Sequence, residues 1–70
     1  MYDYSKLLGV ILSLFNSRFE FALALGVTPQ TLNNKLHNYQ PWNQYQIEEC
    51  CKLLGISRKE IPEYFFTLKH

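Results

Sequence analysis

Apolar residues recur at helical spacing through residues 21–40, and polar residues fill the positions between them. We expect one short helix to end at Gly26, because glycine readily adopts the left-handed conformation that closes helices. A second helix is predicted to start at Thr28, whose hydroxyl can cap it, and Pro29 suits its first position. At about 100° per residue, one side of this second helix collects Leu32, Leu36 and Tyr39. The opposite side collects Gln30, Asn33, Asn34 and His37.

Two helices are predicted before Gly26. Apolar positions three and four residues apart indicate an amphipathic helix from residue 3 to about residue 15, with a stripe formed by Tyr4, Leu7, Leu8, Ile11, Leu12 and Phe15. Ser17, followed three residues later by Glu20, has the pattern of a capping box. The next helix is therefore expected to run from about Arg18 to Leu25.

Turn and cap residues divide the following segment. Asn38 is placed to close the helix that Thr28 begins, and Pro41 prevents its smooth continuation. Asn43 with Gln46 repeats the capping-box pattern and predicts a fourth helix that ends at Gly55. The buried stripe of this helix is expected to hold Ile47, Cys50, Cys51 and Leu54.

The C-terminal part carries a third capping-box pair, Ser57 with Glu60. It predicts a short fifth helix, which Pro62 is expected to end or kink because the residue before a proline disfavours the helical conformation. An aromatic tail follows at residues 63–70. Its aromatic run would either fold under the first helix or stay partly exposed as a contact surface, and consists of Tyr64, Phe65 and Phe66.

Length and charge narrow the class of protein. The 70 residues make one domain, and 47% of them are hydrophobic, which predicts a compact globule. A core of this size supplies roughly 3–5 kcal/mol, so a homodimer would be a natural supplement. The net charge of +1 is not that of a strongly basic nucleic-acid binder. However, no Asp or Glu occurs in residues 21–47, which carry Lys35 and His37, so one surface can tolerate phosphates.

The sequence offers little for catalysis or metal binding. Adjacent side chains on a helix diverge, so Cys50 and Cys51 are expected to be reduced thiols. Together with His37 and the terminal His70 they lack the paired spacing of a zinc site, and neither metal nor cofactor is expected. Because no nucleophile with a base and orienting acid is visible, we do not expect an enzyme. The short apolar stretches and the absence of a basic leader predict a cytoplasmic protein without a membrane partner.

Amide side chains dominate the polar side of the helix that Thr28 begins. Asparagine and glutamine can match donor and acceptor pairs on base edges, so Gln30, Asn33 and Asn34 favour nucleic-acid reading. An ordinary solvated helix face would show the same residue types. Lys35 lies beside the apolar side, so we expect its stem to follow the core and its ammonium to reach solvent or phosphate. Trp42, just before a helix cap, is expected to pack in the core rather than anchor an interface.

Several strings along the chain carry a family resemblance. They are residues 21–28 (FALALGVT), Thr31-Leu32, Lys35-Leu36, Trp42, Ile47, residues 53–57 (LLGIS) and residues 61–66 (IPEYFF). On these strings the chain resembles the Cro and C1 repressor class of helix-turn-helix domains over nearly its whole length. The last string and residues 2–9 (YDYSKLLG) look like small early regulators of temperate phages of low-GC Gram-positive bacteria. The resemblance implies an all-α, compact five-helix lambda-repressor-like DNA-binding domain, whose helices 2 and 3 form the motif at about residues 17–39.

The resemblance also assigns roles to individual residues. The second helix of family members touches a backbone phosphate at its start, and the third approaches phosphates and base edges. Gln30 and Asn34 are the best amide candidates for adenine. Pro29 replaces a polar side chain at one reading position, and the loop after the third helix is less basic than in many relatives. The residues expected to contact DNA are Ser17, Arg18, Thr28, Pro29, Gln30, Asn33, Asn34, Lys35, His37, Tyr39, Gln40 and Asn43.

Two functions remain open at this point. The first is a sequence-specific transcriptional regulator, a Cro-like phage repressor of the lysis/lysogeny switch in the cytoplasm of a bacterial host. It would bind a double-stranded DNA operator as a dimer, with the recognition helix in the major groove. The alternative is an antirepressor or corepressor that binds the phage repressor protein and modulates its DNA binding. The near-neutral charge favours this alternative, because a protein partner does not require strong phosphate affinity.

Overall fold

The computed structural model describes residues 1–69, and within that range it confirms the predicted all-α class with five helices. The helices are α1 (Ser5–Leu14), α2 (Arg18–Leu25), α3 (Pro29–Leu36), α4 (Gln44–Leu54) and α5 (Ile61–Phe65), with a short 3₁₀ helix, η1 (Arg58–Glu60), before α5. His70, which is expected to have no role, lies outside the described residues. Within residues 1–69 no single helix is long and apolar enough to cross a membrane, although α1 and α2, bent by 90°, pass as a pair by length and composition.

Local capping fixes the ends of the central helices. The side chains of Ser17, Thr28 and Asn43 each accept a hydrogen bond from the backbone N–H three residues on, at 3.1, 3.1 and 2.8 Å. Gly26 and Gly55 end α2 and α4 with φ of 83° and 69°. An added Cβ would meet open space at both glycines, so backbone conformation rather than crowding favours glycine there. These predicted starts and stops are confirmed.

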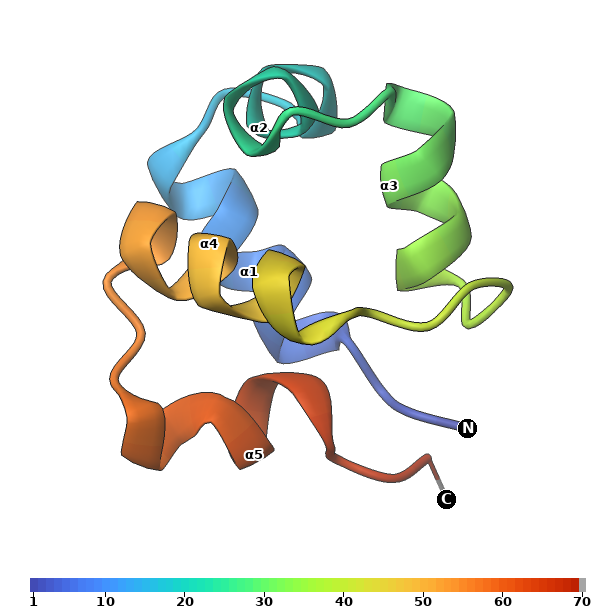
Figure 1. The fold of residues 1–70 in the computed structure, drawn as a ribbon, viewed down its shortest axis with the longest axis vertical. Helices are drawn as coiled ribbons and strands as arrows, with labels where there is room; N and C mark the ends of the chain where they lie inside the picture. Colours follow the sequence, from blue (N-terminus) through green and yellow to red (C-terminus); the bar gives the residue numbers. More distant parts are fainter. Residues whose placement is uncertain (70) are drawn as a thin grey trace.

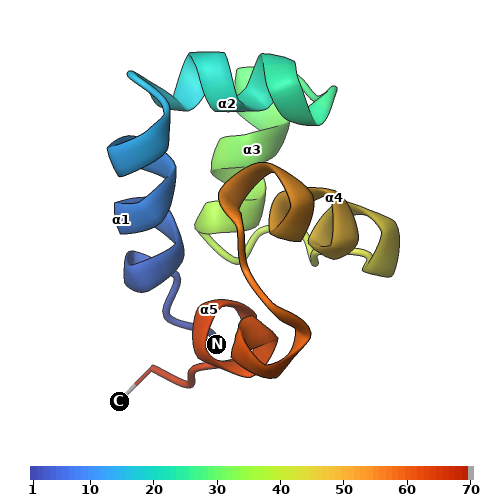
Figure 2. The same cartoon turned by 90° about the vertical axis from the view of Figure 1, so that its left-hand side faces the viewer.

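The helices enclose a single core. In Figure 1, α2 lies across the top of the molecule, α5 lies at the bottom, and α3 runs along one side. Figure 2, turned by 90°, again places α2 and α5 at opposite ends, with α1 and α4 between them. Every α-helix contributes to the buried cluster, which consists of Tyr4, Leu7, Ile11, Phe21, Ala22, Leu32, Cys50, Leu54, Ile56 and Phe65.

The first helix is shorter than its sequence pattern predicts. It begins at Ser5, because the Asp3 carboxylate accepts hydrogen bonds from both the backbone N–H and the hydroxyl of Ser5, at 2.8 and 2.6 Å. Leu7 and Ile11 are fully buried, as expected. Leu12 is exposed, because it lies about 100° around the helix from Ile11 and away from the core.

The C-terminal helix differs most from expectation. Pro62 does not end or kink it there: η1 continues into α5, and Pro62 occupies the first turn, where a missing N–H costs nothing. The aromatic tail is divided, since Phe65 is buried in the core, Tyr64 is half-buried and Phe66 is exposed. The tail therefore does not present one continuous aromatic surface.

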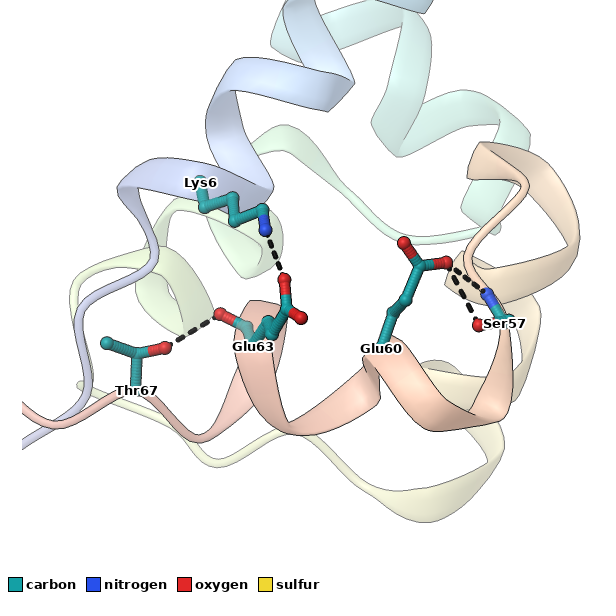
Figure 3. A network of polar contacts seen from close by, with 5 residues as sticks. All are labelled: Lys6, Ser57, Glu60, Glu63 and Thr67. Atoms are coloured by element: carbon teal, nitrogen blue, oxygen red, sulfur yellow. Dashed lines mark hydrogen bonds and ion pairs between the residues drawn. The ribbon is translucent and has the colours of Figure 1, made fainter.

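Polar contacts join α5 to α1 and close the chain ends. Figure 3 shows the Lys6 ammonium directed at the Glu63 carboxylate, and the Thr67 hydroxyl donating to the Glu63 carbonyl at 2.7 Å. Next to them the two terminal segments pair, through an antiparallel bridge between Tyr2 and Leu68. The N-terminal segment is thereby held beside residues 67–69.

Candidate nucleic-acid interface

The α2–α3 pair is connected by a tight turn whose polar groups are satisfied locally. The N–H groups of Gly26 and Val27 both donate to the Ala22 carbonyl, at 2.9 and 3.0 Å. Ala22 is fully buried, and its small side chain permits close packing between the helices. Leu32 fills the space on the α3 side and is also fully buried. These residues hold the outer face of α3 in a fixed position.

Two amides on that outer face form a pair. Gln30 Nε2 donates to Asn34 Oδ1 at 3.0 Å across one turn of α3. Within residues 1–69, Gln30 Oε1 and Asn34 Nδ2 make no hydrogen bond. An acceptor and a donor are therefore presented side by side on one helix face. This arrangement complements the N6 donor and N7 acceptor that adenine shows in the major groove.

Asn33 is used differently from its two neighbours. Its Oδ1 accepts a hydrogen bond from Arg18 Nη1 at 3.3 Å, and both residues are half-buried. This contact ties the start of α2 to the middle of α3. Arg18 therefore keeps its position at the N-terminus of α2, where its charge adds to the positive end of the helix dipole. Asn33 therefore connects α2 to α3, in addition to its predicted contact with a base.

Lys35 contradicts the expectation that its ammonium reaches solvent or phosphate. The residue is only 5% exposed, and Nζ donates to the Pro41 carbonyl at 2.8 Å. The ammonium also lies 5.8 Å from the centre of the Trp42 ring, and burial lowers its pKa. The loop after α3 folds back over the lysine, so the charge satisfies a backbone carbonyl. The expected direction of the ammonium is therefore wrong, and the DNA contact at Lys35 stays an untested prediction.

The residues after α3 form an exposed rim. The helix ends at Leu36, so Tyr39 does not continue the Leu32–Leu36 side as expected; it is 77% exposed. The ring of Tyr39 lies near that of His37, with centroids 5.9 Å apart. The N–H groups of Tyr39 and Gln40 both donate to the Asn34 carbonyl, at 2.8 and 3.2 Å. The turn thus places His37, Tyr39 and Gln40 beside the end of α3.

Three other predicted contact residues act as caps. Ser17, Thr28 and Asn43 each commit a side-chain oxygen to a helix N-terminus. Pro29 occupies the first turn of α3 beside Thr28 and is half-buried. Caps leave several helix N–H groups pointing outward, and such groups bind anions without a charged side chain. The starts of α2 and α3 are accordingly the phosphate-compatible parts of this face.

Sequence reasoning identified Asn38 as a helix-closing residue and missed its second role. Its φ of 66° confirms the left-handed conformation. Its side chain also accepts from the Tyr2 N–H and donates to the Tyr2 carbonyl, both at 2.9 Å. No local pattern signals this contact, since the two residues are 36 positions apart. The rim after α3 is therefore attached to the N-terminal segment.

Trp42 packs against the core under this loop, as predicted. Edge-to-face contacts place its ring 6.3 Å from the Tyr4 ring and 5.4 Å from the Phe65 ring. Its buried Nε1 has no hydrogen-bond partner within residues 1–69. A pocket of about 310 Å³ lies beside it and is lined by aromatic side chains together with Asn38, Gln40, Pro41 and Ile47.

The two cysteines lie on α4 and are not part of the α2–α3 face. Cys50 and Cys51 are free, and burial raises the pKa of Cys50 to about 12. The Cys51 pKa is raised as well, chiefly by burial, so both thiols stay neutral at physiological pH. In the described part of the chain, no three His, Cys, Asp or Glu side chains gather where they could hold a metal ion.

Comparison with known families covers almost the whole chain. A family model described as a protein of unknown function (DUF739) matches residues 1–68. The chain belongs to the DUF739 family. No curated protein matches this DUF739 chain. The family description names no activity. The feature of this chain that indicates a function is the α2–α3 face, with its paired amides and capped helix starts.

Proposed function

We propose that this DUF739 protein is a sequence-specific double-stranded DNA-binding regulator, with α2 and α3 as a helix-turn-helix and α3 in the major groove. The observation that carries the proposal is the Gln30–Asn34 pair, which presents one acceptor and one donor on an exposed helix face. No carboxylate occurs anywhere in residues 21–47 to repel a phosphate backbone. Reading of an A·T pair at this position follows from the chemistry of the two amides.

Phosphate contacts would set the register of the protein on the duplex. The capped starts of α2 and α3, with Arg18 beside one of them, offer N–H groups and one guanidinium. His37, Tyr39 and Gln40 would meet the flanking backbone, since they are exposed next to α3. With Lys35 withdrawn into the fold, few cations remain, so a shallow salt dependence is expected.

The biological role that fits the Cro-like resemblance is repression by occlusion in the lysis/lysogeny switch of a temperate phage. Two copies on one operator would place their α3 helices about 34 Å apart, in successive major grooves. Bound in this way, the protein would cover promoter DNA. Such a role requires no catalytic group.

Selection from a random duplex library, followed by anisotropy measurements at fixed salt, tests the proposal. Gln30→Ala and Asn34→Ala should each weaken binding by about 1–3 kcal/mol and relax selectivity at the same A·T pair. Asn16→Ala is the matched control, because Asn16 is an exposed amide outside α3. Unchanged discrimination in both α3 variants would refute base reading by this pair.

A second candidate, an antirepressor or corepressor, is favoured by one observation. The burial of Lys35 leaves a face with few charges, which carries amides and the 77% exposed Tyr39, a composition suited to a protein partner. The partner would be the phage repressor encoded beside this protein. A salt titration of DNA binding, with and without that repressor, separates the two functions. A stable mixed complex without DNA binding by the chain alone would select the second.

A further inference from the structure

A groove of about 580 Å³ lies between α4 and α5, away from the α2–α3 face. Its apolar lining comes from Ile47 and Cys51 of α4 and from Ile61 and Phe66 at the two ends of α5. The residues that α4 contributes follow i, i+3 and i+4 spacing over about two turns, so they form one stripe along the helix. The groove therefore has the length and apolar character to accept one short helix face.

The charges at the edge of the groove are not balanced. The Arg58 guanidinium has no hydrogen bond or ion pair within residues 1–69. Lys52 approaches Glu49 only at 3.5 Å and remains largely exposed. Glu48 is the acidic residue of the lining and comes from the N-terminal half of α4. The end of the groove beside η1 is thus positively charged and can bind a carboxylate from another molecule.

The outer face of α2 has the complementary character. Phe19 and Leu23, four residues apart on one side of the helix, are 56% and 63% exposed. Glu20 is exposed next to Phe19, and only its Oε2 is engaged, by the Asn16 N–H at 3.2 Å. The outer face of α2 thus presents an apolar pair with a carboxylate beside it, which matches the apolar lining and the unpaired Arg58 of the groove.

We propose that the α4–α5 groove binds the outer face of α2 from a second copy of this chain. Phe19 and Leu23 of one copy would enter the apolar groove of the next, and Glu20 would face Arg58. Figures 1 and 2 place α2 at the opposite end of the molecule from α5, so one molecule cannot fill its own groove. The association is therefore head to tail, with different surfaces on the two partners. The contact needs no DNA, although α2 also carries Arg18 of the proposed DNA interface, so sedimentation without DNA tests it separately from DNA binding.

Concentration-dependent sedimentation of the full chain tests this contact. The wild type should show a rising average mass, whereas Leu23→Gln and Arg58→Glu should each stay monomeric. Leu14→Gln and Lys59→Glu are matched controls and should associate like the wild type, since Leu14 is 57% exposed and neither residue lines the groove. A wild type that remains monomeric at every concentration would overturn the proposal. So would equal loss of association in the variants and their controls.

Mixing the two variants tests the head-to-tail geometry directly. Leu23→Gln keeps an intact groove and Arg58→Glu keeps an intact α2 face, so an equimolar mixture should form one contact per pair. The mixture should reach twice the mass of one chain and no more, although each variant alone stays monomeric. A mixture that stays monomeric while the wild type associates would rule out this pairing of surfaces. Circular dichroism of each variant verifies that it remains folded.

Discussion

Tyr2 and Asn38 exchange two hydrogen bonds of 2.9 Å, between the backbone of one residue and the side-chain amide of the other. Asn38 also adopts the left-handed backbone conformation that closes α3 at its C-terminal end. One residue thus closes a helix and binds the N-terminal segment. The proposed DNA-contacting rim depends on both properties.

Substitution at Asn38 should separate these two properties. Asn38→Gly retains access to the left-handed conformation and loses the two side-chain bonds, so we expect a destabilisation of about 1–2 kcal/mol. Asn38→Ala should cost roughly 1 kcal/mol more than Asn38→Gly, because alanine keeps a Cβ at positive φ and lacks the polar side chain with which asparagine tolerates that conformation. Urea unfolding followed by the fluorescence of Trp42, the single tryptophan, measures both. Equal loss in the two variants would contradict the backbone role, and no loss in Asn38→Gly would contradict the bonds.

Lys35 should be dispensable for DNA binding although it lies on α3. Lys35→Met keeps the apolar stem and should change affinity by less than about twofold, with the same salt slope as the wild type. Arg18→Gln, which can still bond Asn33, should lower that slope by about 0.9 if Arg18 neutralises one phosphate. Anisotropy at several salt concentrations gives both values. A reduced slope in Lys35→Met would show that its ammonium leaves Pro41 to meet DNA.

Removing the Lys35 ammonium should instead affect folding. The Pro41 carbonyl would lose its donor, and because Pro41 is exposed and water can take the donor's place, we expect the net cost of a typical hydrogen bond, about 0.5–1.5 kcal/mol. Lys35→Met should therefore unfold at lower urea concentration than the wild type. Lys59→Met, an exposed lysine on η1, serves as the control. Equal midpoints for the two variants would mean that the Lys35–Pro41 contact adds no stability.

The buried thiol of Cys50 should make the protein unstable in alkali. Its pKa is raised from 9.0 to about 12 in the folded chain, so the unfolded state loses this proton first. The contribution of the protonated Cys50 thiol to the free energy of unfolding is complete below pH 9.0. It is lost as pH rises toward 12, at about 1.4 kcal/mol per pH unit. Urea unfolding under reducing conditions between these values measures the slope. Cys50→Ala should flatten it, whereas Cys51→Ala should retain most of it.

Glu60 should titrate below its ordinary range. Its carboxylate accepts hydrogen bonds from the Ser57 N–H and hydroxyl, both at 3.0 Å, and these lower its pKa, the backbone bond most strongly (Figure 3). The stabilisation is present above pH 4.5, the ordinary pKa of a glutamate, and is lost as pH falls through the lower pKa of the folded chain. Carboxyl NMR should show that Ser57→Ala raises the Glu60 pKa without fully restoring it. Full restoration would mean that the backbone bond is absent in solution.

Much of the candidate site follows from local sequence. Ser17, Thr28 and Asn43 cap helices whose first residues follow directly, and Gly26 and Asn38 close helices through their own backbone preferences. Periodicity also placed Gln30 and Asn34 together on the outer side of α3. The pairing of their side chains follows because residues four apart on a helix are neighbours.

The sequence by itself determined the helices, their caps and the acid-free amide face, because these depend on residues within one or two turns of each other. Tertiary structure decided the direction of the Lys35 ammonium, the exposure of Leu12 and Tyr39, and the division of the aromatic tail. Each of these depends on which distant segment covers the residue: the loop at Pro41 covers Lys35, and the core takes Phe65. Helical periodicity gives the side of a helix on which a residue lies. Only packing between segments far apart in the chain decides whether that side is covered.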